Sequence, residues 1–505
     1  MKNRIKQYLL AASMCVGLTA CSDFFEPIPG VQFGLDETFA SKQRTEEYLN
    51  NVYSYVREVT DAIHPNTYGG IFTEASLDGA NRWNKTYAEW TNGSFNSASA
   101  QASEYFSKYY QAIAKASTFI QNVDKCTEAA ASTRGKWKSE ARALRAYYYF
   151  ELLRLYGPIP LIGEDPIPLD ASLEELIKER NSVDECVNFI ATELQSAIDS
   201  GDLLQRAGKA NLGRMDVATC MALKAKLYLY WASPLFNGNT DQASVKNKDG
   251  KQLFPQTEDN SKWTQARDAY ERFMTFATGQ GYKLTEVYTN GKLDPYASCR
   301  AAGEFFTTTW EAVDELIFVK LRDLYDYTYW VCPKFTDFQD TDVTGGGGYY
   351  TTQETVDLFF TKDGLTIEED PGYDKFEGIP SANNFTSGRY YDPNNPSRLY
   401  FDADKSKVLK QWKDREPRFY VNITYSGSIW LNEGKYNEEM RTDFTNGANG
   451  TCGKSKASGD CPDSGYLIRR GAKASNNNGS KHFSPVLRLA DMYLGYAEAL
   501  CMCSD

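Results

Sequence analysis

The chain has 505 residues and a formal net charge of −12, and it contains only two histidines. An acidic chain without a basic tract argues against nucleic acid as a partner. The shortage of histidine argues against a His-rich metal site and against a Ser-His-Asp triad. We expect no metal and no cofactor. Aromatic residues make up 14% of the sequence, which is more ring surface than a core requires and is typical of a binding surface.

The N-terminus has the pattern of a targeting segment. A basic start is followed by an apolar stretch from Leu9 to Ala20, which is too short to span a bilayer. The sequence Leu18-Thr19-Ala20-Cys21 then resembles a lipobox, in which Cys21 becomes the acylated first residue of the mature chain. We therefore predict a lipoprotein signal peptide over residues 1–20 and a lipidated tether over 21–36. Several acyl chains on Cys21 would anchor the protein stably to a membrane.

The first three helices are predicted over Thr45–Val59, over Glu104–Val123 and from Ser132 to Gly157, the last forming most of the central stretch Trp137–Ile162, whose end is expected to be extended. The third has small and apolar residues on most faces, so this helix should be buried on most sides. We expect Ser132 to cap its start and Gly157 with Pro158 to end it. Three arginines interrupt its apolar surface, namely Arg142, Arg145 and Arg154. Two interpretations are open: pairing with carboxylates on neighbouring helices, which the rarity of unpaired buried charge favours, or binding of a phosphate or carboxylate ligand.

Four further helices are predicted beyond the central one. Ser182 and Glu185 form a capping box at the start of the first of them. The helices come mostly in pairs, with small alanines where two helices would touch, which is typical of tetratricopeptide (TPR)-like packing. The strict repeat signature of that class is absent. The four helices span Ser182–Ile198, Met215–Trp231, Trp263–Phe276 and Val486–Leu500.

Between residues 280 and 485 the helical pattern weakens. Short strands are predicted over Glu315–Lys320 and Phe419–Tyr425, separated by long polar loops. The run Gly345–Gly348 is neither preceded by a predicted strand nor followed by a suitable helix, so we interpret it as a flexible loop and not as a phosphate cradle. The predicted fold class is mainly α, with TPR-like helix pairs and a loop-rich part that contains short β-strands.

Cysteine usage predicts no disulfide framework, because an odd number of cysteines beyond Cys21 is dispersed over a long chain. The most favourable single bridge would join Cys452 to Cys461, which flank a Gly/Ser/Lys loop. Cys186 and Cys220 lie inside helical patterns and are predicted to be packed thiols.

Two aromatic clusters in polar, non-periodic stretches are the candidate ligand site. Flat rings pack on the C–H faces of sugars, while amide and guanidinium groups bond to vicinal hydroxyls. Alternation at 325, 327 and 329 would place three tyrosines on one strand face. A structural role for these rings in the core stays open as an alternative. The candidates are Asn81, Arg82, Trp83, Trp90, Tyr325, Tyr327, Tyr329 and Trp330.

No catalytic residue is predicted. The chain contains neither an HExxH nor a GxSxG motif. The 67 acidic residues leave a glycosidase carboxylate pair as an alternative, although none stands in a recognised catalytic frame.

A series of segments, taken in order, carries a family resemblance. They are the lipobox with Ser22-Asp23-Phe24-Phe25, Tyr156–Leu161, Gly213-Arg214, Ala222–Tyr230, Ser233–Phe236, Thr352-Gln353-Glu354, Arg415–Phe419 and Arg488–Leu500. With these segments the chain resembles the SusD/RagB outer-membrane lipoproteins of gut-type Bacteroidetes over nearly all of its mature length.

The resemblance implies a lipid-anchored protein that faces outward on the cell outer membrane. Such a protein binds an oligosaccharide or another nutrient and passes it, uncleaved, to a TonB-dependent SusC-like transporter. It also implies an N-terminal helical region over residues 37–280 and a C-terminal region over 281–505. Family members usually continue past a helix like Arg488–Leu500 with another helix pair, so we expect the C-terminal region to be truncated. Alternatives are a peptide ligand, a surface glycoside hydrolase and a scaffold that makes only protein contacts.

Overall fold

The structure is a computed structural model. It describes residues 34–57, 76, 79–81, 89, 93–165, 167–168, 171–303, 314–322, 329–335, 345–376, 378–430, 440–445, 452–453, 460–472 and 482–503. The predicted signal peptide, Cys21 and most of the predicted tether lie outside these residues. Among the described residues, none of the helices has both the length and the apolar character needed to cross a membrane.

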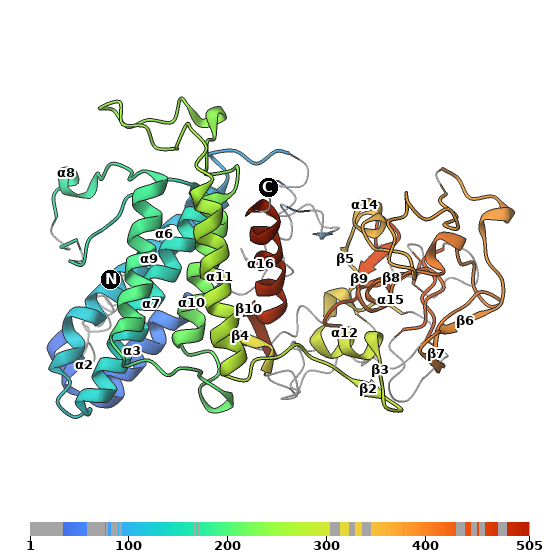
Figure 1. Cartoon of the computed structure of the whole chain (residues 1–505), viewed down its shortest axis with the longest axis horizontal. Helices are drawn as coiled ribbons and strands as arrows, with labels where there is room; N and C mark the ends of the chain where they lie inside the picture. Colours follow the sequence, from blue (N-terminus) through green and yellow to red (C-terminus); the bar gives the residue numbers. More distant parts are fainter. Residues whose placement is uncertain are drawn as a thin grey trace, which may run out of the picture.

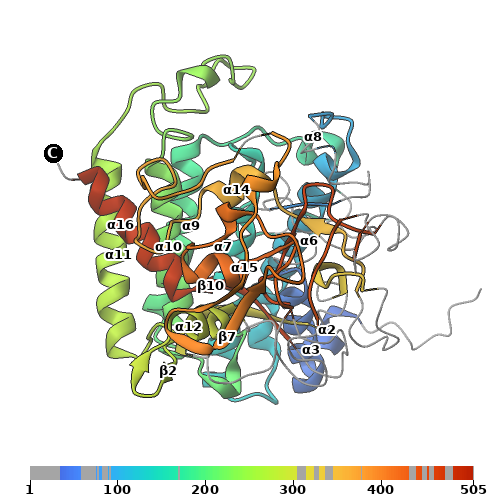
Figure 2. The same cartoon turned by 90° about the vertical axis from the view of Figure 1, so that its right-hand side faces the viewer.

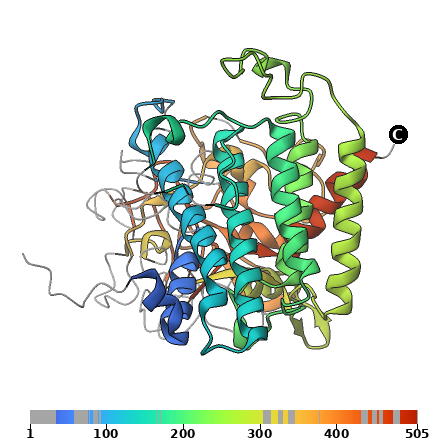
Figure 3. The same cartoon turned by 90° about the vertical axis from the view of Figure 1, so that its left-hand side faces the viewer.

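The main helices stand side by side on one side of the molecule (Figures 1 and 3). They are α2 (Leu35–Ala40), α3 (Lys42–Ser54), α6 (Ala100–Asn122), α7 (Ala131–Tyr156), α9 (Val183–Asp199), α10 (Val217–Ala232), α11 (Ser261–Gly279) and α16 (Leu489–Cys503). From α6 to α11 each helix packs against the next in this order, and α16 returns from the end of the chain to pack on α11. This arrangement agrees with the predicted TPR-like helix pairs, and the mainly α fold class is confirmed.

The central helix α7 is buried on all sides over most of its length. Every residue from Ala143 to Leu153 is buried, because α6 and α9 cover it from two sides. Gly157 ends the helix with a φ of +68°, a conformation that glycine adopts easily. The predicted cap at Ser132 is wrong. The helix begins at Ala131, after a turn closed by the hydrogen bond from the Ala129 amide to the Cys126 carbonyl.

Arg142, Arg145 and Arg154 of α7 pair with carboxylates, as the first interpretation holds. Arg145 is fully buried, and its Nε donates to Glu193 of α9 at 2.8 Å, while Nη1 donates to Ser117 of α6 at 3.0 Å. Arg142 also reaches Glu193, at 2.9 Å, and Arg154 pairs with Glu151 of its own helix at 2.8 Å. Arg145 therefore ties α7 to both neighbours. Loss of one partner from such a buried pair is strongly destabilising.

The starts of α9 and α10 are fixed by side-chain caps. The predicted capping box of α9 is confirmed, since the Ser182 amide donates to Glu185 at 2.7 Å and the Glu185 amide donates back to Ser182 at 3.3 Å. Asp216 caps α10 and accepts from the amides of Thr219 and Ala207, both at 2.7 Å. Asp216 has no exposed surface, and burial raises its pKa to about 6 although these hydrogen bonds oppose the rise.

The second half of the chain forms a loop-rich part beside the helices, and Figure 2 shows it in front of them. Its largest sheet has the strand order β1 (Ala80–Asn81), β5 (Tyr349–Tyr350), β9 (Tyr466–Ile468) and β8 (Ile423–Tyr425). Three antiparallel pairs accompany it: β4 (Leu316–Arg322) with β10 (His482–Arg488), β2 (Tyr288–Thr289) with β3 (Lys292–Leu293), and β6 (Arg389–Asp392) with β7 (Asn395–Asp402). The short helices are α8 (Leu173–Leu176), α12 (Pro295–Gly303), α14 (Gln353–Asp357) and α15 (Pro417–Asn422). The 3-10 turns are η3 (Val123–Lys125), η4 (Lys209–Asn211), η5 (Thr240–Gln242), η9 (Ala382–Asn384) and η10 (Lys410–Trp412).

Three predicted elements need correction or adjustment. The strand Phe419–Tyr425 is half wrong: its first four residues belong to α15, because Pro417 favours a helix start, and only Ile423–Tyr425 is a strand. The last helix begins at Leu489, since Val486 to Arg488 belong to β10, which pairs with β4. The first helix is shifted toward the N-terminus, to Lys42–Ser54. The strand predicted over Glu315–Lys320 is confirmed as β4.

The cysteine predictions are met in part. Cys186 and Cys220 are fully buried within α9 and α10, as predicted. Cys452 and Cys461 are also buried, but no disulfide joins them in the described part of the chain. Cys452 instead belongs to a buried cluster with Cys332, Tyr349 and Trp430, to which Cys461 does not belong.

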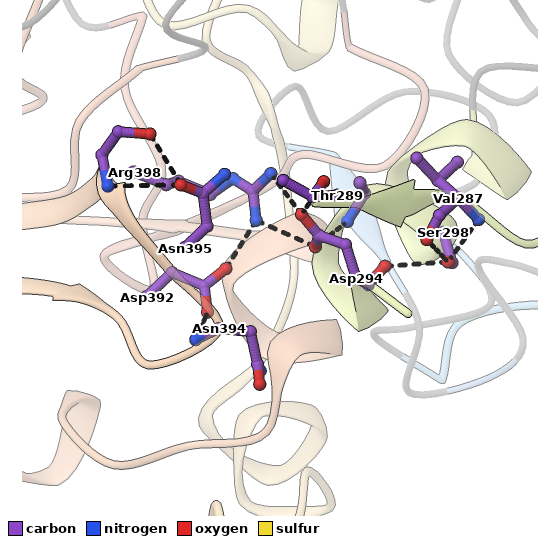
Figure 4. A network of polar contacts seen from close by, with 10 residues as sticks. Val287, Thr289, Asp294, Ser298, Asp392, Asn394, Asn395 and Arg398 are labelled. Atoms are coloured by element: carbon purple, nitrogen blue, oxygen red, sulfur yellow. Dashed lines mark hydrogen bonds and ion pairs between the residues drawn. The ribbon is translucent and has the colours of Figure 1, made fainter. Parts of the chain in front are cut away.

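A buried network around Arg398 joins the β6–β7 hairpin to the start of α12 (Figure 4). The Arg398 guanidinium donates to both oxygens of Asp294 at 3.0 Å and to Asp392 at 2.5 Å, and both carboxylates are almost completely buried. Burial raises the pKa of Asp294, but the hydrogen bonds from Arg398 and from the amide of Ala297 outweigh it, so the pKa lies below its usual value. This network fixes the outer loops against one another and buries both carboxylates, while Arg398 stays partly exposed.

Candidate functional site

The structure places only some of the predicted site residues. Arg82, Trp83, Trp90, Tyr325 and Tyr327 lie outside the described residues. The backbone of Asn81 belongs to β1, and Tyr329 and Trp330 are described with their side chains. The geometry of the candidate site therefore rests on these last three residues and on what holds them.

Asn81, the first residue of one candidate stretch, lies at the β1 edge of the largest sheet. Asn81 in β1 pairs with Tyr349 in β5, and Ala80 pairs with Tyr350. Gly79 precedes β1 at a point where a Cβ atom would lie 2.9 Å from both the Tyr349 hydroxyl and the Ile468 side chain. Glycine is therefore needed for β1 to approach the sheet. As a result, the stretch that leads to Trp83 and Trp90 starts at Asn81, beside Tyr349.

Tyr349 directly follows the run Gly345–Gly348, and this run supports the second aromatic cluster. The amide of Gly346 donates to the carbonyl of Tyr329 at 2.7 Å, and the amide of Gly348 donates to the carbonyl of Trp330 at 3.2 Å. All four glycines are buried. A Cβ on Gly346 would overlap the Trp330 ring, and one on Gly345 would overlap the backbone of Tyr329.

The prediction that Gly345–Gly348 is a flexible loop is thus wrong. The run is a close-packed support, and the absence of side chains lets the backbone of residues 329–332 lie directly on it. An ion pair between Lys334 and Asp460, at 2.5 Å, closes the same region, with the carbonyl of Asp460 lying next to Gly347.

Tyr329 and Trp330 are half-buried, and their rings form an edge-to-face pair with centroids 4.9 Å apart and planes at 82°. Residues 329–331 are helical, so the predicted strand alternation does not extend to Tyr329. One part of Trp330 packs on the buried cluster that contains Val331 and Tyr349, while the rest stays accessible. A half-buried indole on a rigid support can stack on a flat ligand without first being ordered.

The described residues show no arrangement for metal chemistry, since no group of three or more His, Cys, Asp or Glu side chains lies together in them. Three hollows, two in the loop-rich part and one beside α3 and β4, also have walls without Asp or Glu among the described residues. These hollows therefore contain no pair of carboxylates of the kind that glycoside hydrolysis requires.

Two features of this site were missed in the sequence. The glycine run carries a signal, because four successive glycines next to an aromatic pair allow close backbone approach as well as flexibility. The short strands β1 and β5 carry almost no sequence signal, since a two-residue strand has no periodicity to detect.

The fold defines a mainly helical, TPR-like protein with a loop-rich part that contains Tyr329 and Trp330, and comparison with known proteins agrees with this fold. A family model described as "Starch-binding associating with outer membrane" matches residues 32–229, and the "SusD family" model matches residues 315–505. Together the two matches cover more than half of the chain. The chain belongs to the SusD/RagB family.

Individual relatives are distant. A SusD-like protein of Bacteroides ovatus is 27% identical over 175 residues, which are 33% of this chain and 30% of that protein. The chain thus matches less than a third of that relative's length. The solved structure of BT4246 has a TM-score of 0.69 at 24% identity, covering 91% of this chain and 78% of its own. A SusD-like carbohydrate-binding protein from Bacteroides fragilis has a TM-score of 0.58 at 18% identity, covering 92% and 75%. These structures share the fold.

Proposed function

We propose that this protein is a glycan-binding lipoprotein of the cell surface. It holds an oligosaccharide on its aromatic surface and passes it to a TonB-dependent, SusC-like transporter in the outer membrane. The ligand contacts are Asn81, Arg82, Trp83, Trp90, Tyr325, Tyr327, Tyr329 and Trp330. Acylated Cys21 anchors the protein, and the loop-rich part faces outward.

One observation carries the ligand site: the pairing of Asn81 with Tyr349, which follows the glycine run that supports Trp330. This pairing supports the proposal because Asn81 begins the first candidate stretch and Trp330 ends the second. Two separate rings can stack on successive sugars of one oligosaccharide, whereas a single ring gives little specificity. Membership in the SusD/RagB family, with its starch-binding description, supports a glycan as the ligand.

Binding without cleavage is the form of the function that the site supports best. The three hollows with walls free of Asp and Glu argue against a glycosidase, and the predicted contacts are rings, amides and a guanidinium. A peptide ligand is the second candidate, because tyrosine and tryptophan rings also pack on peptide side chains.

Affinity electrophoresis against a panel of neutral and acidic polysaccharides tests the proposal. The wild-type protein should be retarded by at least one polysaccharide and should release no reducing ends from it. Trp330→Ala should lose the retardation. Tyr288→Ala is the matched control, because Tyr288 is an exposed tyrosine on the separate β2–β3 hairpin. This variant should be retarded like the wild-type protein. Binding to peptides but to none of the polysaccharides would favour the second candidate, and release of reducing ends would favour a hydrolase.

A further inference from the structure

The largest of the three hollows lies on the opposite side of β5 from β1, next to strand β9. Its volume is about 550 Å³, within the roughly 300–1,000 Å³ typical of small-molecule sites. It is lined by residues from several separate segments, including Gln353 of α14, Trp412 of η10 and Tyr466 of β9. None of the residues predicted to bind ligand from the sequence is among them.

The first wall of the hollow is built around the hydroxyl of Tyr466. This hydroxyl accepts from the indole Nε1 of Trp412 at 2.9 Å and donates to the Gln353 side-chain oxygen at 2.7 Å. The Trp412 and Tyr466 rings meet edge to face, with centroids 5.9 Å apart. Burial raises the pKa of Tyr466 to about 12, so its hydroxyl keeps its proton and remains a donor. These contacts fix the orientation of both rings and of the Gln353 amide.

A second part of the wall is held by Asp443, which does not itself line the hollow. Its carboxylate accepts from the Thr445 hydroxyl at 2.6 Å and from the Ser426 hydroxyl at 3.4 Å, and both of these residues line the hollow. Phe444 stands between Asp443 and Thr445 in the sequence, and its ring also lines the hollow. Both walls are therefore ordered by hydrogen bonds that do not require a ligand.

The chemistry of the walls selects the ligand class. Among the described residues, the hollow is lined by aromatic rings, amides and hydroxyls, with no Lys, Arg, Asp or Glu. Amides and hydroxyls both donate and accept hydrogen bonds, as sugar hydroxyls do, and the rings match the apolar faces of sugars. A charged ligand would find no counter-charge in these walls and would lose its hydration.

We propose that this hollow is a second binding site, specific for a neutral sugar unit. The inference takes its ligand class from the proposed function, but its location and residues are independent of the aromatic surface around Trp330. Tyr466 and Tyr350 lie on the paired strands β9 and β5, so the two sites share one small sheet.

The test fills the hollow from its rim. Ser464 is exposed and lines the hollow, so Ser464→Trp should place an indole inside it, with loss of the hydrogen bonds that the Ser464 hydroxyl makes to the backbone of Tyr466. Ser261→Trp, at the exposed start of α11, is the matched control. Each change is made in the Trp330→Ala background, and saturation-transfer NMR measures binding of maltose, cellobiose and lactose, with glucuronate as the charged comparison.

At least one neutral disaccharide should show saturation transfer from the protein that carries Trp330→Ala as its only change. Ser464→Trp should reduce this transfer roughly tenfold, which is the effect of losing about one stacking contact. Ser261→Trp should leave it unchanged, and glucuronate should show none. If Ser464→Trp lowers the melting temperature, Gln353→Ala, which changes an exposed side chain, takes its place.

Two results separate this inference from the proposed function. The second site is overturned if neither Ser464→Trp nor Gln353→Ala changes the disaccharide transfer. If Trp330→Ala also abolishes the polysaccharide retardation, the proposed function still stands. If Ser464→Trp reduces the transfer in the Trp330→Ala background while no polysaccharide retards the wild-type protein, the hollow is supported and the proposed function is contradicted.

Discussion

Gly346 lies so close to the indole of Trp330 that a single added methyl group would overlap the ring. This contact makes the position of Trp330 depend on a residue that has no side chain to bind a ligand. It therefore separates the support of the site from the site itself.

Gly346→Ala should displace the Trp330 ring and reduce glycan affinity about as strongly as Trp330→Ala does. The overlap should also lower the free energy of unfolding by about 1–3 kcal/mol, the usual cost of overpacking. Gly163→Ala is the control, because a Cβ there would meet nothing within 4 Å. Affinity electrophoresis and thermal denaturation measure the two effects. Wild-type affinity in Gly346→Ala would show that the ring does not need this support.

Leu144→Asp should destabilise the fold by several kcal/mol, because Leu144 is completely buried in α7 and a carboxylate there would have no partner. Leu173→Asp provides the control, since Leu173 in α8 is 73% exposed and the same change should have little effect. Urea denaturation of both variants gives the comparison. Equal stability of the two variants would contradict the assignment of the buried face.

Asp216→Asn should change how stability depends on pH. The folded-state pKa of Asp216 is raised to about 6, above its unfolded value of about 3.9. The stabilisation of the folded state by protonated Asp216 is therefore complete below about pH 4 and is lost as the pH rises through 6. The amide of Asn can still cap α10 but does not titrate. Between pH 4 and pH 7 the wild type should lose up to roughly 3 kcal/mol relative to the variant. Parallel stability curves over this range would contradict the raised pKa.

Cys21→Ala should release the protein from membranes, because the predicted anchor consists of acyl chains on this residue. Cell fractionation should find the variant in the soluble fraction and the wild type with the outer membrane. Cys501→Ala, which changes an exposed cysteine of α16, should leave fractionation unchanged. Membrane retention of the Cys21 variant would reject the lipobox.

The helical half was predictable because its signals are local. The apolar surface of α7 repeats at helical spacing over the whole stretch, and Ser182 with Glu185 marks the start of α9 within four residues. Helix ends were less predictable where the cap is made by the backbone. Ala130 precedes α7 without a side-chain cap, so Ser132 was the more favourable residue by type and yet not the cap.

The loop-rich half was less predictable because its strands depend on distant partners. Asn81 is in a strand only because Tyr349 pairs with it, and β10 takes three residues from the predicted last helix because β4 lies beside them. The glycine run signals a loop that another segment can approach closely, but that this segment contains Trp330 is a tertiary contact that no local pattern encodes. For the same reason, the hollow lined by Trp412 and Tyr466 has no signature in the sequence.

The central claim is that Trp83, Trp90 and Trp330 bind one ligand, and paired measurements of affinity and melting temperature on single alanine variants test it most directly. Each stacking ring should contribute on the order of 1–3 kcal/mol to binding, as aromatic stacking does on nucleic-acid bases. Affinity should therefore fall by roughly five- to a hundredfold while the melting temperature stays close to wild type. Trp430→Ala is the control for the opposite pattern, because it removes a completely buried ring. Its melting temperature should fall by several degrees. Loss of affinity with stability kept, at two of the three positions, is the predicted result. Loss of stability with intact affinity at these positions would place the rings in the core and contradict the claim.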